Sequence, residues 1–559
     1  MNQDYSRSSR WRAFCSLLSI ALLATTVLGW QQQAAIPVAA PALSAPEREA
    51  AAKLRVETIR EVATDLSAPE MQGRGTAQPG GDKAAAYLAE RFKKIGLKPL
   101  GTNGTYYQPV KFREITFLPE TSFVVGNEPL KLGPDFAVTQ PLSGDKSVSG
   151  GLVFVAYGLT SSTPKRDDLA GLNLNGKIVV MLQGPPAIVN KESWRKARVQ
   201  FDILRYLVSQ GVAAIVFVNH GREQHGYKIT ADYSTRRQLE PEDSEEMPSF
   251  LPPFLNVSDE AAEKLFSASG ISRAEALAKA DADGFKPIDL KQTAKITVRL
   301  KKNKGVGNNV VGLLEGSDPN LKAEAVVYSA HYDAYGIADN RIYHGAADNA
   351  LGVGEMLAVA EALAATTTKP KRSFIFMAVT GEEYGGHGSD HWVQHPTWKI
   401  KQVAANLNFD GMGTEVYGPV KVLVAFGGEH SNLGESLRTV ADALDLKVIP
   451  DPMPEEKAFY RSDHYFFVKK GIPALMLLGA PEGEIKSWVD RMKQWEKTDY
   501  HQPTDVVRSD WNWEGPKTMA TVGLILGLRV ANQDEMPKWL TSSPFNRERG
   551  TNQPPPPEP

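Results

Sequence analysis

The spacing of apolar residues divides the chain into segments of different predicted structure. Between residues 80 and 97 the apolar side chains repeat at helical spacing, and Gly96 follows as a candidate helix C-cap. From about residue 140 to 300 short β-rich runs predominate, and two of them, residues 179–182 and 214–218, are apolar enough to be buried strands. We therefore expect a helical opening followed by a β-rich segment.

After Lys301-Lys302-Asn303-Lys304 the pattern changes again, and strand and helix candidates alternate. The strand candidates are residues 325–329, 373–379, 403–409, 420–425 and 474–478, and helical patterns follow Gly352, Ser431 and Thr518. Alternation of this kind predicts an α/β fold in which a mixed, largely parallel sheet is flanked by helices.

The length of 559 residues exceeds one ordinary hydrophobic core, so two or three domains are expected. We assign an N-terminal signal or anchor at 1–45, a discontinuous α/β domain at 46–139 and 300–538, an inserted β-rich domain at 140–299, and a disordered Pro-rich tail at 539–559. The tail assignment rests on the run from Pro554 to Pro557, which cannot pack as helix or sheet.

The first 45 residues have the pattern of an export signal. Arg7, Arg10 and Arg12 precede a mostly apolar stretch at residues 13–30, and small residues follow. The alternative is an uncleaved membrane anchor, because the apolar stretch approaches the ~18 residues that can span a bilayer. We expect an exported, periplasmic or extracellular protein that meets a membrane only if this segment is retained. The only cysteine, Cys15, lies inside it, so a cleaved chain would form no disulfide.

The charge composition gives no sign of a polyanionic partner. The chain has 63 Lys and Arg against 65 Asp and Glu, a formal net charge of −2. This balance does not favour nucleic acid or an anionic membrane surface.

Acidic residues and histidines recur at the ends of the predicted strands. His331 follows the strand candidate at 325–329, the pair Glu382-Glu383 follows residues 373–379, and Asp410 ends the run at 403–409. In open α/β sheets ligands bind at the carboxyl ends of the strands. Asp348, at a predicted helix start, and His501, in a polar loop, have the same residue types.

Each of these residues alone has an ordinary explanation. Asp348 could be a helix N-cap, and Glu382-Glu383 could be a solvated acidic loop. Together, however, they form a set of oxygen and nitrogen donors without sulfur, which suits Zn²⁺, Mn²⁺ or Co²⁺ in a two-metal site. One carboxylate would remain as a general base, and Asp333 could fix the tautomer of His331.

Other hydrolase motifs are absent from the sequence. It has no His-Glu-x-x-His helix for a single-zinc peptidase and no Gly-x-Ser-x-Gly elbow for a nucleophilic serine. A cysteine nucleophile is excluded if the signal is removed.

At these residues the chain resembles the M28 metallopeptidases, which include co-catalytic zinc aminopeptidases and carboxypeptidase relatives. The matching stretches, in the family's order, are Ser329-Ala330-His331-Tyr332-Asp333, residues 345–352, Thr380-Gly381-Glu382-Glu383-Tyr384-Gly385, Asn408-Phe409-Asp410 and Tyr500-His501. The resemblance covers about residues 300–530 and the helical region at 50–100. Residues 140–300 resemble a protease-associated (PA) domain, which several M28 enzymes carry as an insertion.

The resemblance implies a role for each residue. His331 and Asp410 would bind one metal ion, Glu383 and His501 a second, and Asp348 both. Glu382 would be the general base, Asp333 would orient His331, Tyr500 would donate a hydrogen bond to the oxyanion, and Arg461 would contact a substrate carboxylate. A cis peptide is expected at Asp348-Asn349. His344, in a longer stretch than the family's compact members have, could compete as a ligand, whereas His464 is expected to make a structural hydrogen bond.

The implied activity is hydrolysis of N-terminal residues from peptides by an exported aminopeptidase with two Zn²⁺. A carboxypeptidase or dipeptidase of the same family is the first alternative. An inactive binding protein on the same scaffold is the second. The sequence leaves the oligomeric state open.

Overall fold

The computed structural model describes residues 42–557, except 141, 163–164, 188, 191–192, 195–197, 223–225, 339 and 412. The expected signal or anchor at 1–45 falls almost entirely outside these residues. Residues 41–559 form one compact unit. Among the described helices, none is both long enough and apolar enough to cross a membrane.

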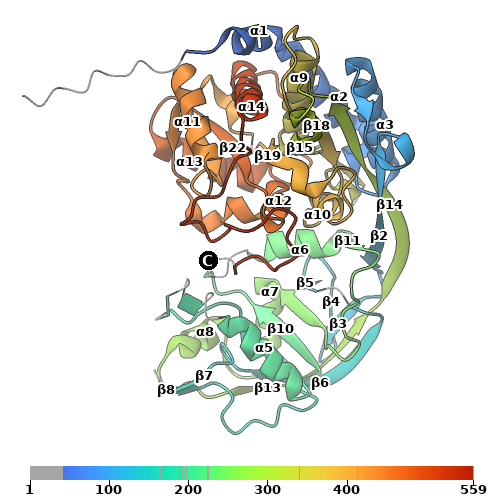
Figure 1. Ribbon diagram of the computed structural model, residues 1–559. Coiled ribbons are helices and arrows are strands. Elements are labelled where there is room, and N and C mark those ends of the chain that lie inside the picture. Colours follow the sequence, from blue (N-terminus) through green and yellow to red (C-terminus); the bar gives the residue numbers. More distant parts are fainter. Residues whose placement is uncertain are drawn as a thin grey trace, which may run out of the picture. The chain divides into compact units, whose positions relative to one another are not determined.

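A ten-stranded mixed sheet is the scaffold of the site (Figure 1). Its strands lie in the spatial order β11 (Gln238–Pro241), β2 (Tyr107–Phe117), β14 (Leu300–Leu314), β18 (Ser373–Val379), β15 (Ala325–His331), β19 (Val403–Asn408), β22 (Ala474–Pro481), β20 (Val420–Phe426) and β21 (Lys447–Ile449), with β1 (Lys98–Pro99) paired to β14. The four central strands, β18, β15, β19 and β22, run parallel, whereas β11, β2 and β14 pair antiparallel. The predicted α/β class is confirmed, and the parallel part of the sheet is its centre.

Helices cover both faces of this sheet, which explains the continuous apolar character of its central strands. In β15, Val326 and Tyr328 face one hydrophobic core, and Ala325 and Val327 face another. The first core is built with α1 (Ala45–Lys53), α2 (Val56–Ser67), α3 (Pro79–Ile95), α9 (Leu351–Ala364), α11 (Leu433–Ala443) and α14 (Glu514–Asn532). The second is built with α10 (His387–Gln394), α12 (His464–Lys469) and α13 (Ile485–Thr498).

A second, eight-stranded sheet is formed by the residues between β2 and β14. Its order is β4 (Glu128–Leu130), β3 (Ser122–Val125), β13 (Ile288–Val298), β6 (Lys146–Phe154), β9 (Ile178–Leu182), β10 (Ala214–Val218), β12 (Phe254–Val257) and β5 (Phe136–Val138). Its helices are α5 (Val199–Ser209), α6 (Tyr227–Thr235), α7 (Asp259–Phe266) and α8 (Arg273–Asp281). The predicted buried strands at 179–182 and 214–218 are β9 and β10.

The strands change from the first sheet to the second between Phe117 and Ser122, earlier than the boundary that we expected after residue 139. In addition, β11 lies within the expected insertion but pairs with β2 of the first sheet. The division into domains stays a prediction, since residues 41–559 form a single compact unit.

The C-terminal segment is packed against the protein, contrary to our expectation of a disordered tail at 539–559. Phe545 is buried in the second core, and Arg549 Nη1 donates to the carbonyl of Val403 at 2.8 Å. Near the end, Lys470 Nζ donates to Asn552 Oδ1 at 2.7 Å. The prediction was drawn from the Pro run alone, but an aromatic residue and an arginine ahead of it supply the contacts.

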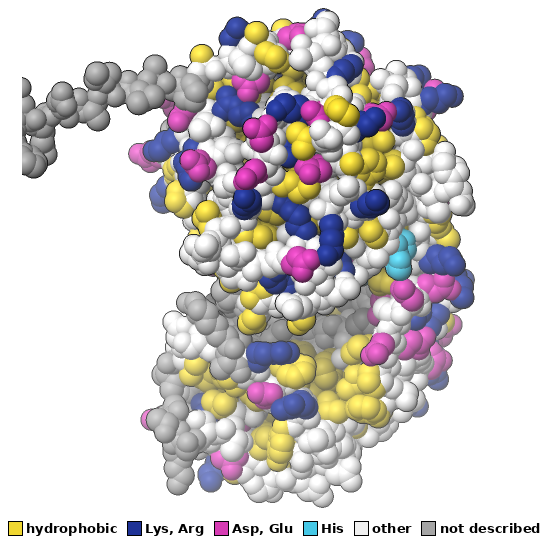
Figure 2. Space-filling view, viewed as in Figure 1, with side chains coloured by type: hydrophobic (Ala, Val, Ile, Leu, Met, Phe, Trp, Pro, Cys, Tyr) yellow, Lys and Arg dark blue, Asp and Glu magenta, His cyan; other side chains and the backbone are white. Residues whose placement is uncertain are grey.

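Charged side chains of both signs are interspersed over the face drawn in Figure 2. This distribution agrees with the near-neutral composition.

The close approach of α14 to β15 depends on glycine. A Cβ added at Gly527 would lie 1.8 Å from the hydroxyl of Tyr328, which is fully buried. Tyr328 cannot easily move away, because its ring stacks on Phe376 at a centroid distance of 5.3 Å and its hydroxyl donates to the carbonyl of Gly523.

We therefore predict that Gly527→Ala destabilises the protein by roughly 1–3 kcal/mol through overpacking. Alanine in a helix otherwise gains about 1 kcal/mol over glycine, so the sign of the effect separates packing from helix propensity. The measurement is the urea unfolding midpoint. Gly144→Ala, where a Cβ would meet nothing within 4 Å, is the control. A stabilised Gly527→Ala variant would contradict this account of the packing.

Candidate active site

Three adjacent parallel strands bring the predicted residues to one edge of the sheet. His331 is the last residue of β15 and is in register with Val379, the last residue of β18. Glu382 and Glu383 follow β18, and Asp410 follows β19 on the other side of β15. Residues far apart in the sequence meet here because parallel neighbours end on the same side of the sheet.

Two sets of side chains each bring three candidate ligand atoms within 4.8 Å of one another. In the first set, His331 Nε2 lies 3.1 Å from Asp348 Oδ1 and 3.3 Å from Asp410 Oδ1. In the second set, His501 Nε2 lies 3.2 Å from Asp348 Oδ2 and 2.9 Å from Glu383 Oε2. Asp348 belongs to both sets and directs one carboxylate oxygen to each histidine.

Glu382 lies beside these sets without belonging to either. Its Oε2 is 3.9 Å from His331 Nε2, and its main-chain N–H donates to Asp333 Oδ1 at 3.2 Å. Burial raises the pKa of Glu382 well above its usual value; the positive charge of His331 opposes this shift, and the negative charge of Asp410 adds to it. A carboxylate with a raised pKa accepts a proton readily, as a general base must.

The pKa shifts of the ligand candidates show how strongly the charges interact. Burial lowers the pKa of His331, but the charges of Asp410 and Glu382 outweigh it and raise the pKa well above its usual value. Burial acts to raise the pKa of Asp348, yet His331 and His501 outweigh it and lower the pKa. Burial raises the pKa of Glu383, and Asp348 adds to the shift against the opposing charge of His501.

The donor atoms fit divalent cations. His331 Nε2 and Glu383 Oε2 are buried, and neither has a partner with hydrogen-bond geometry among the described residues. Buried polar atoms normally have such partners, and the concentrated negative charge at the site also calls for compensation. Metal ions bound by nitrogen and oxygen atoms would supply both.

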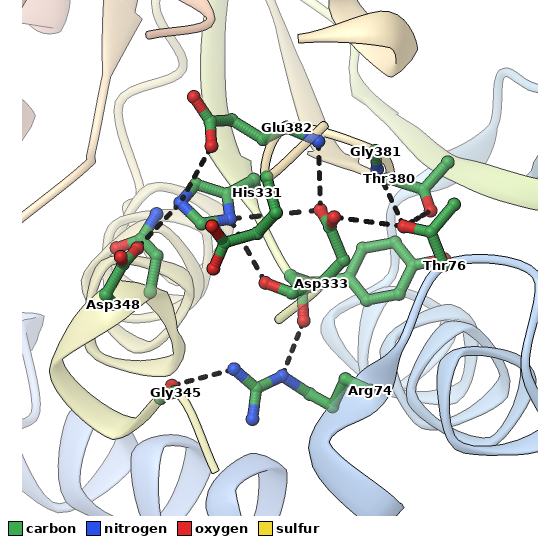
Figure 3. A network of polar contacts seen from close by, with 12 residues as sticks. Arg74, Thr76, His331, Asp333, Gly345, Asp348, Thr380, Gly381 and Glu382 are labelled. Atoms are coloured by element: carbon green, nitrogen blue, oxygen red, sulfur yellow. Dashed lines mark hydrogen bonds and ion pairs between the residues drawn. The ribbon is translucent and has the colours of Figure 1, made fainter. Parts of the chain in front are cut away.

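Arg74 holds together the loops that carry the ligand candidates (Figure 3). Its side chain is fully buried, and its Nε donates to the carbonyl of Tyr332, between His331 and Asp333. Nη2 donates to Gly345 at 2.7 Å, and Nη1 donates to Leu66 at 2.7 Å and to His344 at 2.6 Å. One guanidinium thus connects the loop after β15 with the turn that leads to Asp348.

Thr76 connects the loop of His331 with that of Glu382. Its hydroxyl donates to Asp333 Oδ2 at 2.9 Å and accepts a hydrogen bond from the N–H of Gly381 at 3.0 Å. Figure 3 shows Thr76 between Asp333 and Thr380. Because Asp333 also accepts from the N–H of Glu382, this carboxylate positions the candidate base as well as the loop of His331.

Main-chain and hydroxyl oxygens orient the two histidines. His331 Nδ1 lies 3.2 Å from the carbonyl oxygen of Asp333 and 3.8 Å from its carboxylate, so the carbonyl is the nearer acceptor. The hydroxyl of Tyr335 lies 3.3 Å from His501 Nδ1 and donates to the carbonyl of Glu383 at 3.3 Å. In both histidines, Nε2 is left facing the carboxylates.

Two further residues support the site and were missed in the sequence. Both carboxylate oxygens of Asp505 accept main-chain hydrogen bonds, from Ala347 at 2.9 Å and from Asp348 at 3.1 Å. The hydroxyl of Ser462 donates to Asp410 Oδ2. Asp505 lies four residues after His501 and Ser462 directly follows Arg461, so their proximity to predicted residues was the only signal.

The remaining predicted residues lie around this centre. Tyr500 stacks on His501 with ring centroids 3.6 Å apart. The side chain of Arg461 is 47% exposed, and its Nη1 lies 3.8 Å from Glu456 Oε2. The contact of Arg461 with a substrate stays a prediction.

The two other histidines considered in the sequence lie outside both ligand sets. The Nδ1 of His344 is 2.7 Å from the carbonyl oxygen of Ser67. His464 is fully buried, which lowers its pKa to about 4. The peptide between Asp348 and Asn349 is cis.

A small hollow lies beside the second set of ligand candidates. Its lining includes Asp348, Glu383 and His501 together with Tyr335 and Tyr343. The second set of ligand candidates therefore borders this hollow.

A parallel sheet edge that gathers two such ligand sets around a shared carboxylate is typical of hydrolases with two metal ions. Residues 309–524 match the model of Peptidase family M28.

Comparisons with individual proteins agree with this assignment. The chain is 29% identical over 224 residues to aminopeptidase YwaD of Bacillus subtilis, covering 39% of this chain and 44% of that protein. It spans less than half the length of the curated relatives that it matches. The structure resembles an aminopeptidase from Aneurinibacillus sp. strain AM-1 (TM-score 0.59, 19% identity, 88% of this chain and 97% of that one). It also resembles BSAP, a zinc aminopeptidase from Bacillus subtilis (TM-score 0.52, 17% identity, 86% and 97%). At these identities the structural likenesses show the fold.

From the position of Thr76 we predict that Thr76→Val weakens the binding of divalent metal by roughly 10–100-fold, the usual effect of removing a group that orients ligands. The measurement is metal retention in a chelator competition. Thr121→Val is a matched control, because the Thr121 hydroxyl is also buried, donates to the carbonyl of Arg299 and accepts from its N–H. Both variants lose about 1–3 kcal/mol of stability. Equal metal retention in the two variants would contradict the role of Thr76.

Proposed function

We propose that the protein is a metal-dependent exopeptidase that removes N-terminal residues from peptides. The observation that carries this proposal is the arrangement of carboxylates at the edge of the first sheet. Asp348 belongs to both ligand sets, and Glu382 lies beside them without belonging to either, as a general base would. The M28 match of residues 309–524 and the similarity to aminopeptidase YwaD support it.

Two Zn²⁺ ions are the proposed cofactors, and Mn²⁺ or Co²⁺ would suit the same donors. His331 and Asp410 would hold one ion, Glu383 and His501 the other, and Asp348 both. A pair of such ions polarises a carbonyl group and makes a water molecule more acidic. The similarity to the zinc aminopeptidase BSAP supports the choice of zinc.

The protein's own groups would move the proton. Glu382 takes a proton from the attacking water and later gives it to the leaving amine, and its raised pKa suits both steps. Its main-chain N–H is fixed by Asp333, which keeps the carboxylate beside His331. Tyr500, stacked on His501, is the proposed donor to the oxyanion.

The charges around the site favour recognition of an amino terminus. Acidic side chains predominate there, and another fully buried carboxylate, Asp463, lies near His331 and Asp410 and has a pKa raised by burial to about 7. A carboxypeptidase or dipeptidase would need a cationic cluster for the substrate carboxylate. Arg461, the residue proposed for that contact, lies near Glu456 instead.

An inactive binding protein is the remaining alternative. The proposed base and all five ligand candidates are present in one arrangement, which supports an enzyme. Peptides are the proposed partners. Export of the chain, and membrane attachment through an uncleaved N-terminus, remain part of the proposal.

The test of substrate class compares aminoacyl-p-nitroanilides with N-blocked dipeptides. We expect the zinc-loaded protein to cleave the first group, whose amine is free, and to leave the second intact. Cleavage of the blocked set alone would indicate the carboxypeptidase. Cleavage of neither set across a broad panel of amino acids would favour the binding protein.

The test of mechanism is Glu382→Gln, which keeps the shape of the side chain but removes its ability to take a proton. We expect the variant to retain about two metal ions per chain and to lose 10²–10⁴-fold in kcat, the usual contribution of a general base. Metal content and kcat are measured on the same preparation. Activity near that of the wild type would refute the role of Glu382.

A further inference from the structure

A short segment of the chain connects the second sheet with the edge of the first. It comprises α6 and the residues up to the end of β11. Helix α6 packs on β5 and β12 of the second sheet, where Tyr227 donates to the carbonyl of Gly133 at 2.6 Å. β11 then pairs with β2, next to which it lies in Figure 1. This segment precedes the M28 match at 309–524.

β11 is firmly attached to the first sheet. Arg113 of β2 donates to Glu240 Oε2 from Nε at 3.2 Å and from Nη2 at 2.8 Å. Leu239 is buried against Val110 and Phe112 of β2. The residues directly before β11 are therefore held at a fixed position relative to the sheet edge that carries the site.

Arg236, two residues before β11, lies against the site. Its side chain is buried between two aromatic rings, with the guanidinium carbon 4.2 Å from the ring centroid of Tyr335 and 4.4 Å from that of Tyr343. Its Nη2 donates to the main-chain carbonyl of His501 at 2.9 Å. The geometry combines a cation–π contact with a charge-assisted hydrogen bond, and a planar guanidinium can make both at once.

Two of the three groups that Arg236 contacts, the carbonyl of His501 and the ring of Tyr335, set the position of the His501 side chain. The backbone of His501 has φ of 59°, a left-handed conformation that a non-glycine residue keeps only when its surroundings stabilise it. Its ring packs edge-on to Tyr335 at 4.8 Å, and the Tyr335 hydroxyl lies 3.3 Å from its Nδ1. Arg236 thus fixes the main chain of His501 and the ring that orients its imidazole.

We propose that Arg236 is a positioning residue for the second ligand set, which consists of Asp348, Glu383 and His501. Through Arg236, the α6–β11 segment would help to hold this set in the geometry that binds a metal ion. The inference rests on the proposed function in one respect, namely that this set binds a metal ion. The first set, which contains His331 and Asp410, is oriented by other groups, Asp333 and Ser462. Arg236 should therefore affect one of the two metal ions selectively.

The test uses the full-length, zinc-loaded protein and increasing concentrations of a zinc chelator, with bound zinc counted by atomic emission. The wild type should release its two ions in two steps, and His501→Ala identifies the step that belongs to the second set. We expect Arg236→Met to weaken that step by about 10–100-fold and to leave the other unchanged. Arg236→Lys keeps a cation that can reach the carbonyl and should restore part of the loss.

The matched control is Arg113→Met, which removes the ion pair that ties the same segment to β2 but leaves Arg236 in place. Unfolding midpoints are measured for every variant. If Arg236→Met retains both ions as the wild type does, or loses both in parallel with a loss of stability like that of Arg113→Met, the proposal is overturned. A wild type that binds no zinc overturns the proposed function as well, so the two failures can be told apart.

Discussion

The shared carboxylate of Asp348 is the constraint on which the rest of the site depends. One oxygen faces His331 and the other faces His501, at nearly equal distances of 3.1 and 3.2 Å. This arrangement fixes the separation of the two ligand sets and leaves little freedom to the groups around them. It also concentrates negative charge, since Glu382, Glu383 and Asp410 lie close by in a buried environment. Such a cluster persists only where surrounding groups oppose the repulsion of like charges.

The protein meets this demand with hydrogen bonds to the main chain. Arg74 binds carbonyls on both sides of the loop between His331 and Asp348, and Asp505 accepts from the N–H groups before and at Asp348. Thr76 and Asp333 do the same for the turn that carries Glu382. The candidate ligand side chains are thus positioned by the backbone beneath them, and that backbone is fixed by residues from three separate parts of the chain. A site held in this way is organised before any ligand arrives.

The sequence was sufficient to predict that the strand-end residues His331, Glu382, Glu383 and Asp410 converge, whereas Asp348 and His501 were assigned through the family resemblance. Parallel strands must end on one side of a sheet, so acids and histidines after 325–329, 373–379 and 403–409 had to come together. The supporting residues could not be found by the same reasoning. Arg74, Asp505 and Ser462 act through carbonyls, N–H groups or a ligand carboxylate whose positions are set by the fold, and no spacing rule points to them.

The change of sheet after Phe117 and the pairing of β11 with β2 were missed for a related reason, since the sequence of an apolar strand does not indicate which strands lie beside it. The packing of residues 539–557 was missed because a Pro run dominated the prediction.

The return of the chain to the first sheet for β11 affects how the protein could be divided. The chain leaves the first sheet after β2, comes back for β11 and leaves again for β12, so removing residues 140–299 would also remove a strand of the first sheet. A chain shortened in that way would lose β11 and expose the N–H and C=O groups of one edge of β2. Open strand edges of this kind pair readily with other chains. The short return for β11 therefore pairs residues 112–115 of β2 and makes β11 the edge strand of the sheet that carries the candidate site.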